Sequence, residues 1–166
     1  MDTLWTAVIG AGGTIAAALV TRLFGRETSV RNRSYDKVTG SISDPGPNEA
    51  VPRTFTCSGV VTGLQSGLGL WLAIEVGDLV WPREGKVVPD PDNKWSAPVF
   101  HDPVVQDGAI DRFAVSLFVA DSKVDRRIGK WLEAGRSTGL YAGLRGLPGA
   151  RRIARVDGLH LNSGTP

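Results

Sequence analysis

The chain has 166 residues, of which 42% are hydrophobic and 22% are charged, and its net charge is +2. This length leaves room for one domain with its own core besides a terminal segment. The one cysteine, Cys57, excludes an internal disulfide, and we expect it to be a small apolar core residue. Twenty-one glycines and ten prolines separate short segments, which favours an all-β domain over a helical bundle.

The first predicted element is a transmembrane helix in residues 1–25. No charged side chain occurs from Thr3 to Thr21, and at a rise of about 1.5 Å per residue this stretch spans the roughly 30 Å hydrocarbon core of a bilayer. Trp5 and Phe24 lie near its ends, where aromatic side chains suit the membrane interface. A lipid bilayer is therefore the first predicted partner.

Basic residues after this segment predict its orientation. Arginines recur within residues 22–33, and positively charged flanks stay on the cytoplasmic side. We expect a single-pass protein of the cell membrane, with its N-terminus outside and its C-terminal domain in the cytoplasm. Residues 26–38 are predicted to be a polar linker, residues 39–161 the domain, and residues 162–166 a tail.

Small residues in the predicted helix permit a second hypothesis. Gly12 with Ala16, and Gly13 with Ala17, are pairs four residues apart that let two helices approach closely. The alternative function is a self-assembling protein or membrane-perturbing effector. In that case the chain binds copies of itself through this helix, which is then buried against protein rather than lipid.

The same stretch, VIGAGGTIAAAL, partly matches the glycine turn that binds the pyrophosphate of a dinucleotide. Gly10 and Gly12 fit the first two glycine positions, but the third, where a small residue is needed, is Ile15. The following segment, RETSVRNRSYDK, is too polar to be the second buried strand of such a fold. A nucleotide cofactor is therefore not expected.

Alternation of residues predicts the strands of the domain. GLGLWLAIEV and RFAVSLFVAD alternate between two faces, as strands do. Further strands are predicted in SIS, RTFTCSGVV, NKWSAPVF and RRIARVDGLHL, with a hairpin-like pair in DLVWP and KVV. In RRIARVDGLHL, Ile153 and Arg155 are expected on one face, with Ala154 and Val156 on the other. The count of about seven predicts an antiparallel immunoglobulin-like (Ig-like) β-sandwich.

One helix is predicted within this series of strands, in SKVDRRIGKWLEAGR. Ser122 is a candidate N-cap, and Asp125 makes a variant of the capping box with it. Apolar residues recur at helical spacing from Val124 to Leu132, and Gly135 is placed to end the helix. We expect the apolar stripe to pack at an edge or end of the sandwich.

The segments LWLAIEV, LVWP, KWSAPV and FAVSLFVAD, the inserted helix, and a closing strand after GLRGLPGARRIARV carry a resemblance. This arrangement resembles small bacterial Ig-like β-sandwich domains over about residues 39–161. The resemblance implies that fold and a role as a binding or scaffolding unit. It supplies no catalytic residues.

Catalytic motifs fail on their context. GRSTG formally places Ser137 as a nucleophile, followed by Asp157 and His160 in hydrolase order. A nucleophile elbow needs a strand before the serine and a helix after it, whereas Ser137 follows a predicted helix. A serine hydrolase is therefore only a minor alternative, and we expect no enzyme activity.

Metal-binding motifs are incomplete. The loop DPDNKW offers Asp90, Asp92 and Asn93 as oxygen ligands, but it lacks the glycine and glutamate of a calcium loop. His101 and Asp102 adjoin, yet neighbouring strand residues point to opposite faces. We expect a solvated turn at the first site, and no metal or other cofactor.

The residues best suited to binding are two tryptophans and three arginines. Trp71 and Trp81 are the aromatic candidates, and Trp71 either packs under the inserted helix or offers a stacking surface to a ligand. Arg151, Arg152 and Arg155 belong to a basic C-terminal segment that could face an acidic ligand or an unidentified protein. Nucleic acid is not expected, because no aromatic run accompanies these arginines. The leading prediction is thus a membrane-anchored, non-catalytic binding, sensing or scaffolding module.

Overall fold

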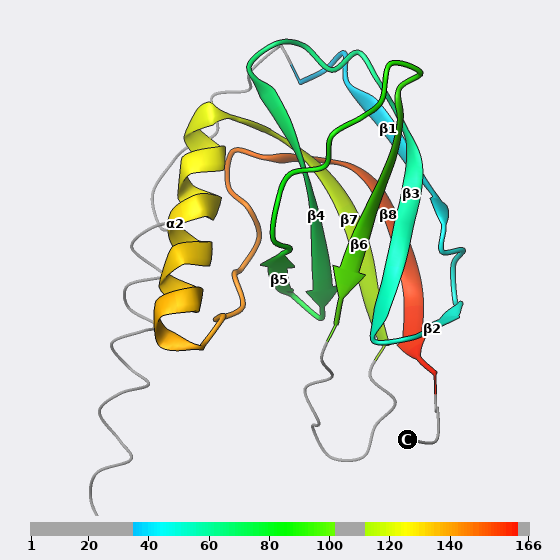
Figure 1. The fold of residues 1–166 in the computed structure, drawn as a ribbon, viewed down its shortest axis with the longest axis vertical. Helices are drawn as coiled ribbons and strands as arrows, with labels where there is room; N and C mark the ends of the chain where they lie inside the picture. The colour runs from blue at the N-terminus through cyan, green and yellow to red at the C-terminus, as the bar shows by residue number, and fades with distance from the viewer. Residues whose placement is uncertain (1–34, 102–111, 163–166) are drawn as a thin grey trace, which may run out of the picture.

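The computed structural model describes residues 35–101 and 112–162, which form eight strands and one helix (Figure 1). The strands are β1 (Thr39–Asp44), β2 (Ala50–Val51), β3 (Thr54–Thr62), β4 (Leu68–Val76), β5 (Leu79–Pro82), β6 (Lys94–Phe100), β7 (Arg112–Asp121) and β8 (Arg151–Leu161). The helix, α2 (Ser122–Thr138), follows β7 directly. The predicted mainly β architecture with one inserted helix is confirmed.

The strands form two sheets. The smaller has the order β1-β3-β6, and the larger has the order β2-β8-β7-β4-β5. Neighbouring strands are antiparallel except for β2 and β8, which are parallel. Strand β2 was not predicted, because two residues are too few to show alternation.

An apolar core fills the space between the two sheets. β4 and β7 contribute alternate residues to it, including the fully buried Leu70, Leu72, Val115 and Leu117. Cys57 on β3 belongs to the same core and is fully buried, as predicted.

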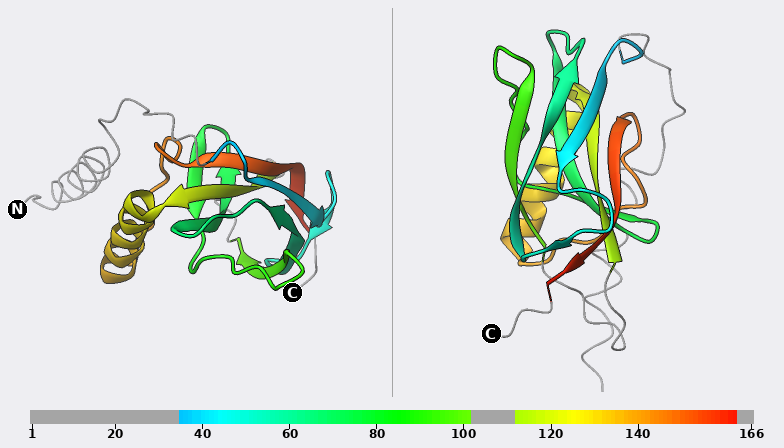
Figure 2. Two further views of the ribbon diagram at one scale, coloured as in Figure 1. Left: turned by 90° about the horizontal axis from the view of Figure 1, so that it is seen from above. Right: turned by 90° about the vertical axis from the view of Figure 1, so that its right-hand side faces the viewer.

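Helix α2 covers the outer face of the larger sheet and makes a third layer (Figures 1 and 2). Its predicted stripe is buried at Val124, Ile128, Trp131 and Leu132. These residues pack on β4 and β7 side chains that point away from the inner core. The prediction that α2 packs at an edge or end of the sandwich is therefore wrong, because the outer face of the larger sheet is itself apolar here.

Both predicted ends of the helix need correction. Asp121, not Ser122, is the N-cap, and its carboxylate accepts hydrogen bonds from the backbone N–H groups of Lys123 and Val124. The helix continues past Gly135 to Gly139, whose φ of 72° gives a left-handed C-cap. Gly135 instead lies inside the helix, where the ring of Tyr141 occupies the space that a Cβ would need.

The predicted hairpin of DLVWP with KVV is also wrong. β5 pairs with β4, and the chain after it stays along the same edge, where Val87 forms a bridge with Leu70. The other edge of β5 is occupied by Leu144, which exchanges two backbone hydrogen bonds with Val80.

Two register shifts between β7 and β8 change which residues of β8 point toward the inner core. Phe118 pairs with Arg152, but Leu117 pairs with Ala154, so Ile153 is the extra residue of a bulge. Ile153 consequently packs on the inner core with Ala154 and Val156, and the prediction that it shares a face with Arg155 is wrong.

The two edges of this sandwich differ. β1 contacts β8 at one edge, where the guanidinium of Arg151 donates to the carbonyl of Val38. Gly40 on β1 leaves room there for the Ile153 side chain, whose Cδ1 lies 2.8 Å from where a Cβ would stand. At the opposite edge, β5 and β6 end their sheets and border an open groove.

The predicted membrane segment lies outside the described residues, as do Gly12, Gly13, Ala16 and Ala17 and most of the predicted linker. Within residues 35–101 and 112–162, no helix is long and apolar enough to cross a bilayer.

Candidate binding groove

Exposed apolar side chains mark two hollows on the described surface. Five large hydrophobic residues in this part of the chain are exposed: Val60, Val88, Phe100, Leu140 and Tyr141. The two valines line one hollow, and the other three line a second. Exposed apolar groups that gather in a concave site indicate binding more strongly than scattered ones.

The larger hollow, which we name the α2–β6 groove, has a volume of about 840 Å³. Its lining residues come from the ends of β4, β5 and β6, from α2 and from the loop that follows α2. Its wall includes Trp81, Arg83, Phe100, Trp131, Leu140 and Tyr141. Its size falls within the range of about 300–1,000 Å³ that is usual for small-molecule sites.

The loop that follows α2 is fixed by two tryptophans. Trp81 Nε1 donates to the carbonyl of Tyr141, and Trp131 Nε1 donates to the carbonyl of Ala142, each at 3.0 Å. A Cβ at Gly143 would lie 2.6 Å from the Trp81 ring, so glycine is required for this packing. The aromatic wall of the groove is therefore held in place rather than left loose.

Tyr141 is positioned by α2 itself. Its ring packs on the backbone of Gly135 and makes an edge contact with Trp131, with ring centroids 5.5 Å apart. The side chain nevertheless remains 40% exposed. Tyr141 thus presents a fixed aromatic surface to solvent in the groove.

The opposite wall reaches the layer between the sheets. Ile74 and Val76 of β4 and Val99 of β6 line it from the inside. Both bordering strands carry a proline, Pro82 on β5 and Pro98 on β6. Because proline has no N–H to donate, these edges are poorly suited to pairing with an added strand.

Arg83 supplies a positive charge in this largely apolar wall. Partial burial lowers the pKa of its guanidinium, while the nearby Cys57 and Glu84 act in the opposite direction. The carboxylate of Glu84 is engaged by Arg136 at 3.0 Å. Among the described residues, the Arg83 guanidinium has no hydrogen-bond partner, whereas its backbone N–H donates to the Leu72 carbonyl at 2.9 Å.

Trp81 lies in the groove wall, but Trp71 does not. Trp71 is 4% exposed and packs under α2, so its ring offers no stacking surface to a ligand. Its Nε1 donates to the carboxylate of Asp125 at 2.7 Å, and the ammonium of Lys86 binds the same carboxylate. Trp71 therefore anchors the helix to the sheet.

The three candidate arginines do not form one basic patch. Arg152 donates to both carboxylate oxygens of Glu75 at 3.0 Å. Arg155 binds Glu75 as well and donates to Asp157 at 2.6 Å. Arg151 lies at the other side of β8, against the carbonyl of Val38.

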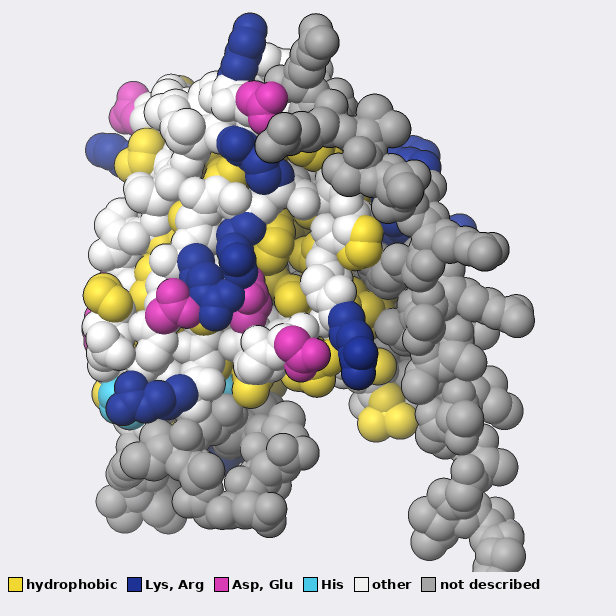
Figure 3. All heavy atoms as spheres, turned by 180° about the vertical axis from the view of Figure 1, so that it is seen from behind, with side chains coloured by type: hydrophobic (Ala, Val, Ile, Leu, Met, Phe, Trp, Pro, Cys, Tyr) yellow, Lys and Arg dark blue, Asp and Glu magenta, His cyan; other side chains and the backbone are white. Residues whose placement is uncertain are grey.

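Viewed from behind, basic and acidic side chains are interspersed over the described surface (Figure 3). The hydrogen bonds of Arg151, Arg152 and Arg155 engage these arginines of β8 with carboxylates or with backbone. A free acidic-ligand site at these positions finds no support in their contacts.

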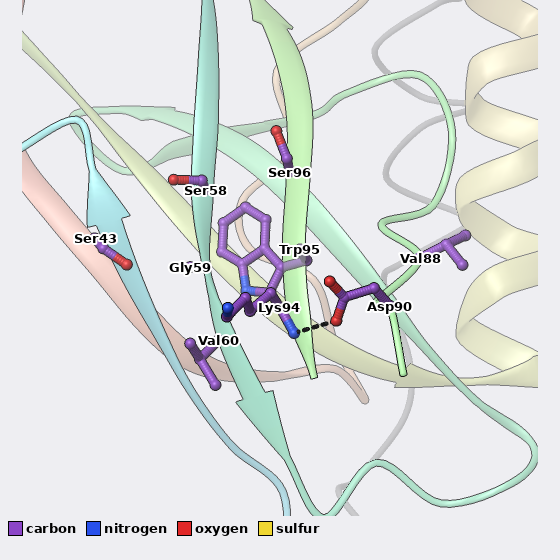
Figure 4. A pocket seen from close by; sticks show the side chains of 9 residues that line it. All are labelled: Ser43, Ser58, Gly59, Val60, Val88, Asp90, Lys94, Trp95 and Ser96. Atoms are coloured by element: carbon purple, nitrogen blue, oxygen red, sulfur yellow. Dashed lines mark hydrogen bonds between the residues drawn. The ribbon is translucent and has the colours of Figure 1, made fainter. Parts of the chain in front are cut away.

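The second hollow, which we name the serine hollow, is shallower and has a volume of about 520 Å³ (Figure 4). Three serines line it on the three-stranded sheet, Ser43, Ser58 and Ser96. The Asp90 carboxylate beside them accepts from its own loop, from the N–H groups of Asp92 and Lys94. This carboxylate closes a turn, and the described residues contain no cluster of three metal-ligating side chains.

The three residues of the hydrolase motif each have other contacts or lie on different elements. Ser137 lies in the last turn of α2, and its hydroxyl donates to the Ala134 carbonyl at 2.9 Å. Asp157 accepts from Arg155, and His160 lies on β8. Ser137 therefore does not occupy the strand-to-helix turn that a nucleophile elbow requires.

No protein-family model matches the sequence, and the comparison with curated proteins gives no match.

Of the residues that line the groove, Trp81 was predicted from the sequence, whereas Arg83, Phe100, Leu140 and Tyr141 were not. The alternation of NKWSAPVF places Phe100 on the outward face of the strand, but a single exposed apolar side chain is ordinary and does not indicate a site.

Proposed function

We propose that this protein is a non-catalytic binding module, an Ig-like β-sandwich that is held at the cytoplasmic face of a membrane by residues 1–25. Its ligand is a small, largely apolar molecule that binds in the α2–β6 groove. The observation that carries the proposal is the convergence of exposed Phe100, Leu140 and Tyr141, from two separate places in the sequence, on one groove of suitable volume.

The fixed geometry of the wall supports a binding role. Trp81 and Trp131 hold the loop that carries Leu140 and Tyr141, so the apolar surface is preformed. A preformed site loses little conformational entropy on binding, which favours affinity. A ligand that covers the exposed rings of Phe100 and Tyr141 would bury a large apolar area, which favours binding.

The chemistry of the wall also favours binding over catalysis. Neither serine nor cysteine is present among the described residues that line the groove. Of its charged groups, Glu84 is paired with Arg136 at the exposed rim. Thr54 and His101 also line the groove, but the His101 imidazole is buried and packs on the Phe113 ring, with ring centroids 4.2 Å apart.

The groove is tested with a neutral aromatic probe, 1-naphthaleneacetamide. Isothermal titration uses the full-length protein in lipid nanodiscs, with protein-free nanodiscs as the blank. Phe100→Ser and Tyr141→Ser should each weaken binding about fivefold, because each removes an aromatic contact of about 1 kcal/mol. Val88→Ser is the matched control, since Val88 is an exposed apolar residue of the serine hollow.

Unchanged binding in both groove variants, or an equal loss in Val88→Ser, would refute the groove as the site. Unfolding midpoints close to that of the parent protein confirm that each variant is folded.

The membrane anchor is tested separately by fractionation. The full-length chain should sediment with membranes and require detergent for release, whereas a chain without residues 1–25 should not. Recovery of the full-length chain in the soluble fraction without detergent would remove the anchor from the proposal.

A further inference from the structure

A single guanidinium interrupts the apolar wall of the α2–β6 groove. Arg83 follows β5 directly, and the hydrogen bond from its backbone N–H to Leu72 fixes it beside β4. The side chain is partly buried and, within the described residues, has no hydrogen-bond partner for its five N–H donors.

The neighbouring acid, Glu84, does not accept a hydrogen bond from the Arg83 guanidinium. Glu84 accepts from Arg136 Nε at 3.0 Å, and both of these side chains are about 60% exposed at the rim. The wall around Arg83 consists mainly of aromatic and aliphatic side chains, with Trp81 and Phe100 among them. A partly dehydrated guanidinium that has no hydrogen-bond partner in residues 35–101 and 112–162 favours an anion that can accept its fork of donors.

We propose that the α2–β6 groove binds a small amphipathic acid, with its carboxylate on Arg83 and its apolar body against Trp81, Phe100 and Tyr141. This inference rests on the proposed function, because it assigns a ligand chemistry to the same groove. The carboxylate forms a paired, charge-assisted hydrogen bond with the guanidinium, and the body covers the exposed rings.

Other occupants fit the groove less well. An extended peptide that adds a strand to β6 would lack a donor at Pro98 and could not continue the sheet. Polyanions, including nucleic acid, need several converging cations, whereas the described wall presents one unpaired arginine. A volume of about 840 Å³ suits a compact ligand with one anionic group.

The test compares two probes that differ only in charge, 1-naphthaleneacetate and 1-naphthaleneacetamide. Both are titrated into the full-length protein in nanodiscs at pH 7.5, and into its Arg83→Met, Arg83→Lys and Lys94→Met variants. Lys94→Met is the matched control, because it removes an exposed cation of the serine hollow.

The wild-type protein should bind the acid about tenfold more tightly than the amide, as a charge-assisted hydrogen bond provides. Arg83→Met should abolish this preference and leave the affinity for the amide unchanged. Arg83→Lys should retain a smaller preference, since lysine carries the charge without the planar fork. Lys94→Met should behave as the wild type.

Equal affinity of the wild-type protein for acid and amide, with Tyr141→Ser weakening both, would overturn the inference and leave the proposed function standing. A preference for the acid that survives Arg83→Met would overturn it as well. Binding of both probes that ignores Tyr141→Ser would instead refute the proposed function.

Discussion

The two edges of the sandwich differ in how the space between the sheets is closed. One edge is filled by packed side chains, and the other borders an open groove. Where β1 meets β8, small and aliphatic residues let the sheets close, and Gly40 accommodates Ile153 and Leu117. Where β5 and β6 end their sheets, the rings of Trp81 and Phe100 border a groove that remains open.

This difference means that side chains at the closed edge contribute mainly to stability, whereas those at the open edge are available for ligand binding. At the closed edge, apolar groups are buried against one another, so their removal costs folding free energy. At the open edge, comparable groups face solvent, so their removal costs little stability but removes contact area for a ligand. Each of the following predictions compares a buried site with the open edge or with a variant that lacks the buried group.

The largest loss of folding stability is expected from Leu117→Ala. Leu117 is fully buried and lies 3.2 Å from where a Cβ of Gly40 would stand. Its truncation should lower the free energy of unfolding by about 3 kcal/mol. Phe100→Ala at the open edge should cost less than about 0.5 kcal/mol, because this side chain is 63% exposed. Urea unfolding measures both, and equal losses would contradict the distinction between the edges.

A smaller difference in the free energy of unfolding is expected between substitutions of two glutamates. The Glu75 carboxylate is 7% exposed and holds Arg152 and Arg155, whereas Glu84 at the groove rim is 62% exposed and holds Arg136. Glu75→Gln should therefore destabilise the fold by about 2 kcal/mol, as loss of a buried, charge-assisted network does.

The matched Glu84→Gln variant should change stability by no more than about 0.5 kcal/mol. If Glu84→Gln proves as destabilising as Glu75→Gln, the rim is part of the folded core rather than an open border.

The last prediction concerns the pH dependence of stability. Burial raises the pKa of the Cys57 thiol from 9.0 to about 12, with Asp44 adding to the rise and Arg83 of the groove opposing it. The folded state therefore favours the neutral thiol. Its contribution to stability is present below about pH 9 and is lost as the pH rises toward 12.

Cys57→Ala should lack this alkaline loss, so the difference in urea midpoint between wild type and variant should change from pH 8 to pH 11. A constant difference over that range would show that the thiol does not titrate differently in the folded and unfolded chains.

Local sequence patterns predicted the parts of the fold that depend on local order. Alternation in GLGLWLAIEV and RFAVSLFVAD identified β4 and β7, and helical spacing identified the buried stripe of α2. The helix boundaries were displaced because Asp121 and Ser122 are both good N-cap residues, and the sequence does not distinguish adjacent candidates.

Features that depend on register or on distant pairing could not be predicted in this way. The bulge at Ile153 arises from how β8 pairs with β7, which no pattern within RRIARVDGLHL encodes. The groove joins Phe100 to Tyr141, about forty residues later, and to Arg83 earlier in the chain. Only the tertiary fold brings these residues together.

The central claim is that the open edge binds the ligand, and the tryptophan indoles test it most directly. Trp81 and Trp131 lie in the groove wall, whereas Trp71 under α2 and Trp95 between the sheets are buried elsewhere. In the full-length ¹⁵N-labelled protein in nanodiscs, saturation with 1-naphthaleneacetate should shift the indole N–H signals of Trp81 and Trp131 and leave those of Trp71 and Trp95 unchanged. Shifts confined to Trp71 or Trp95, or no shift at any of the four, would contradict the account.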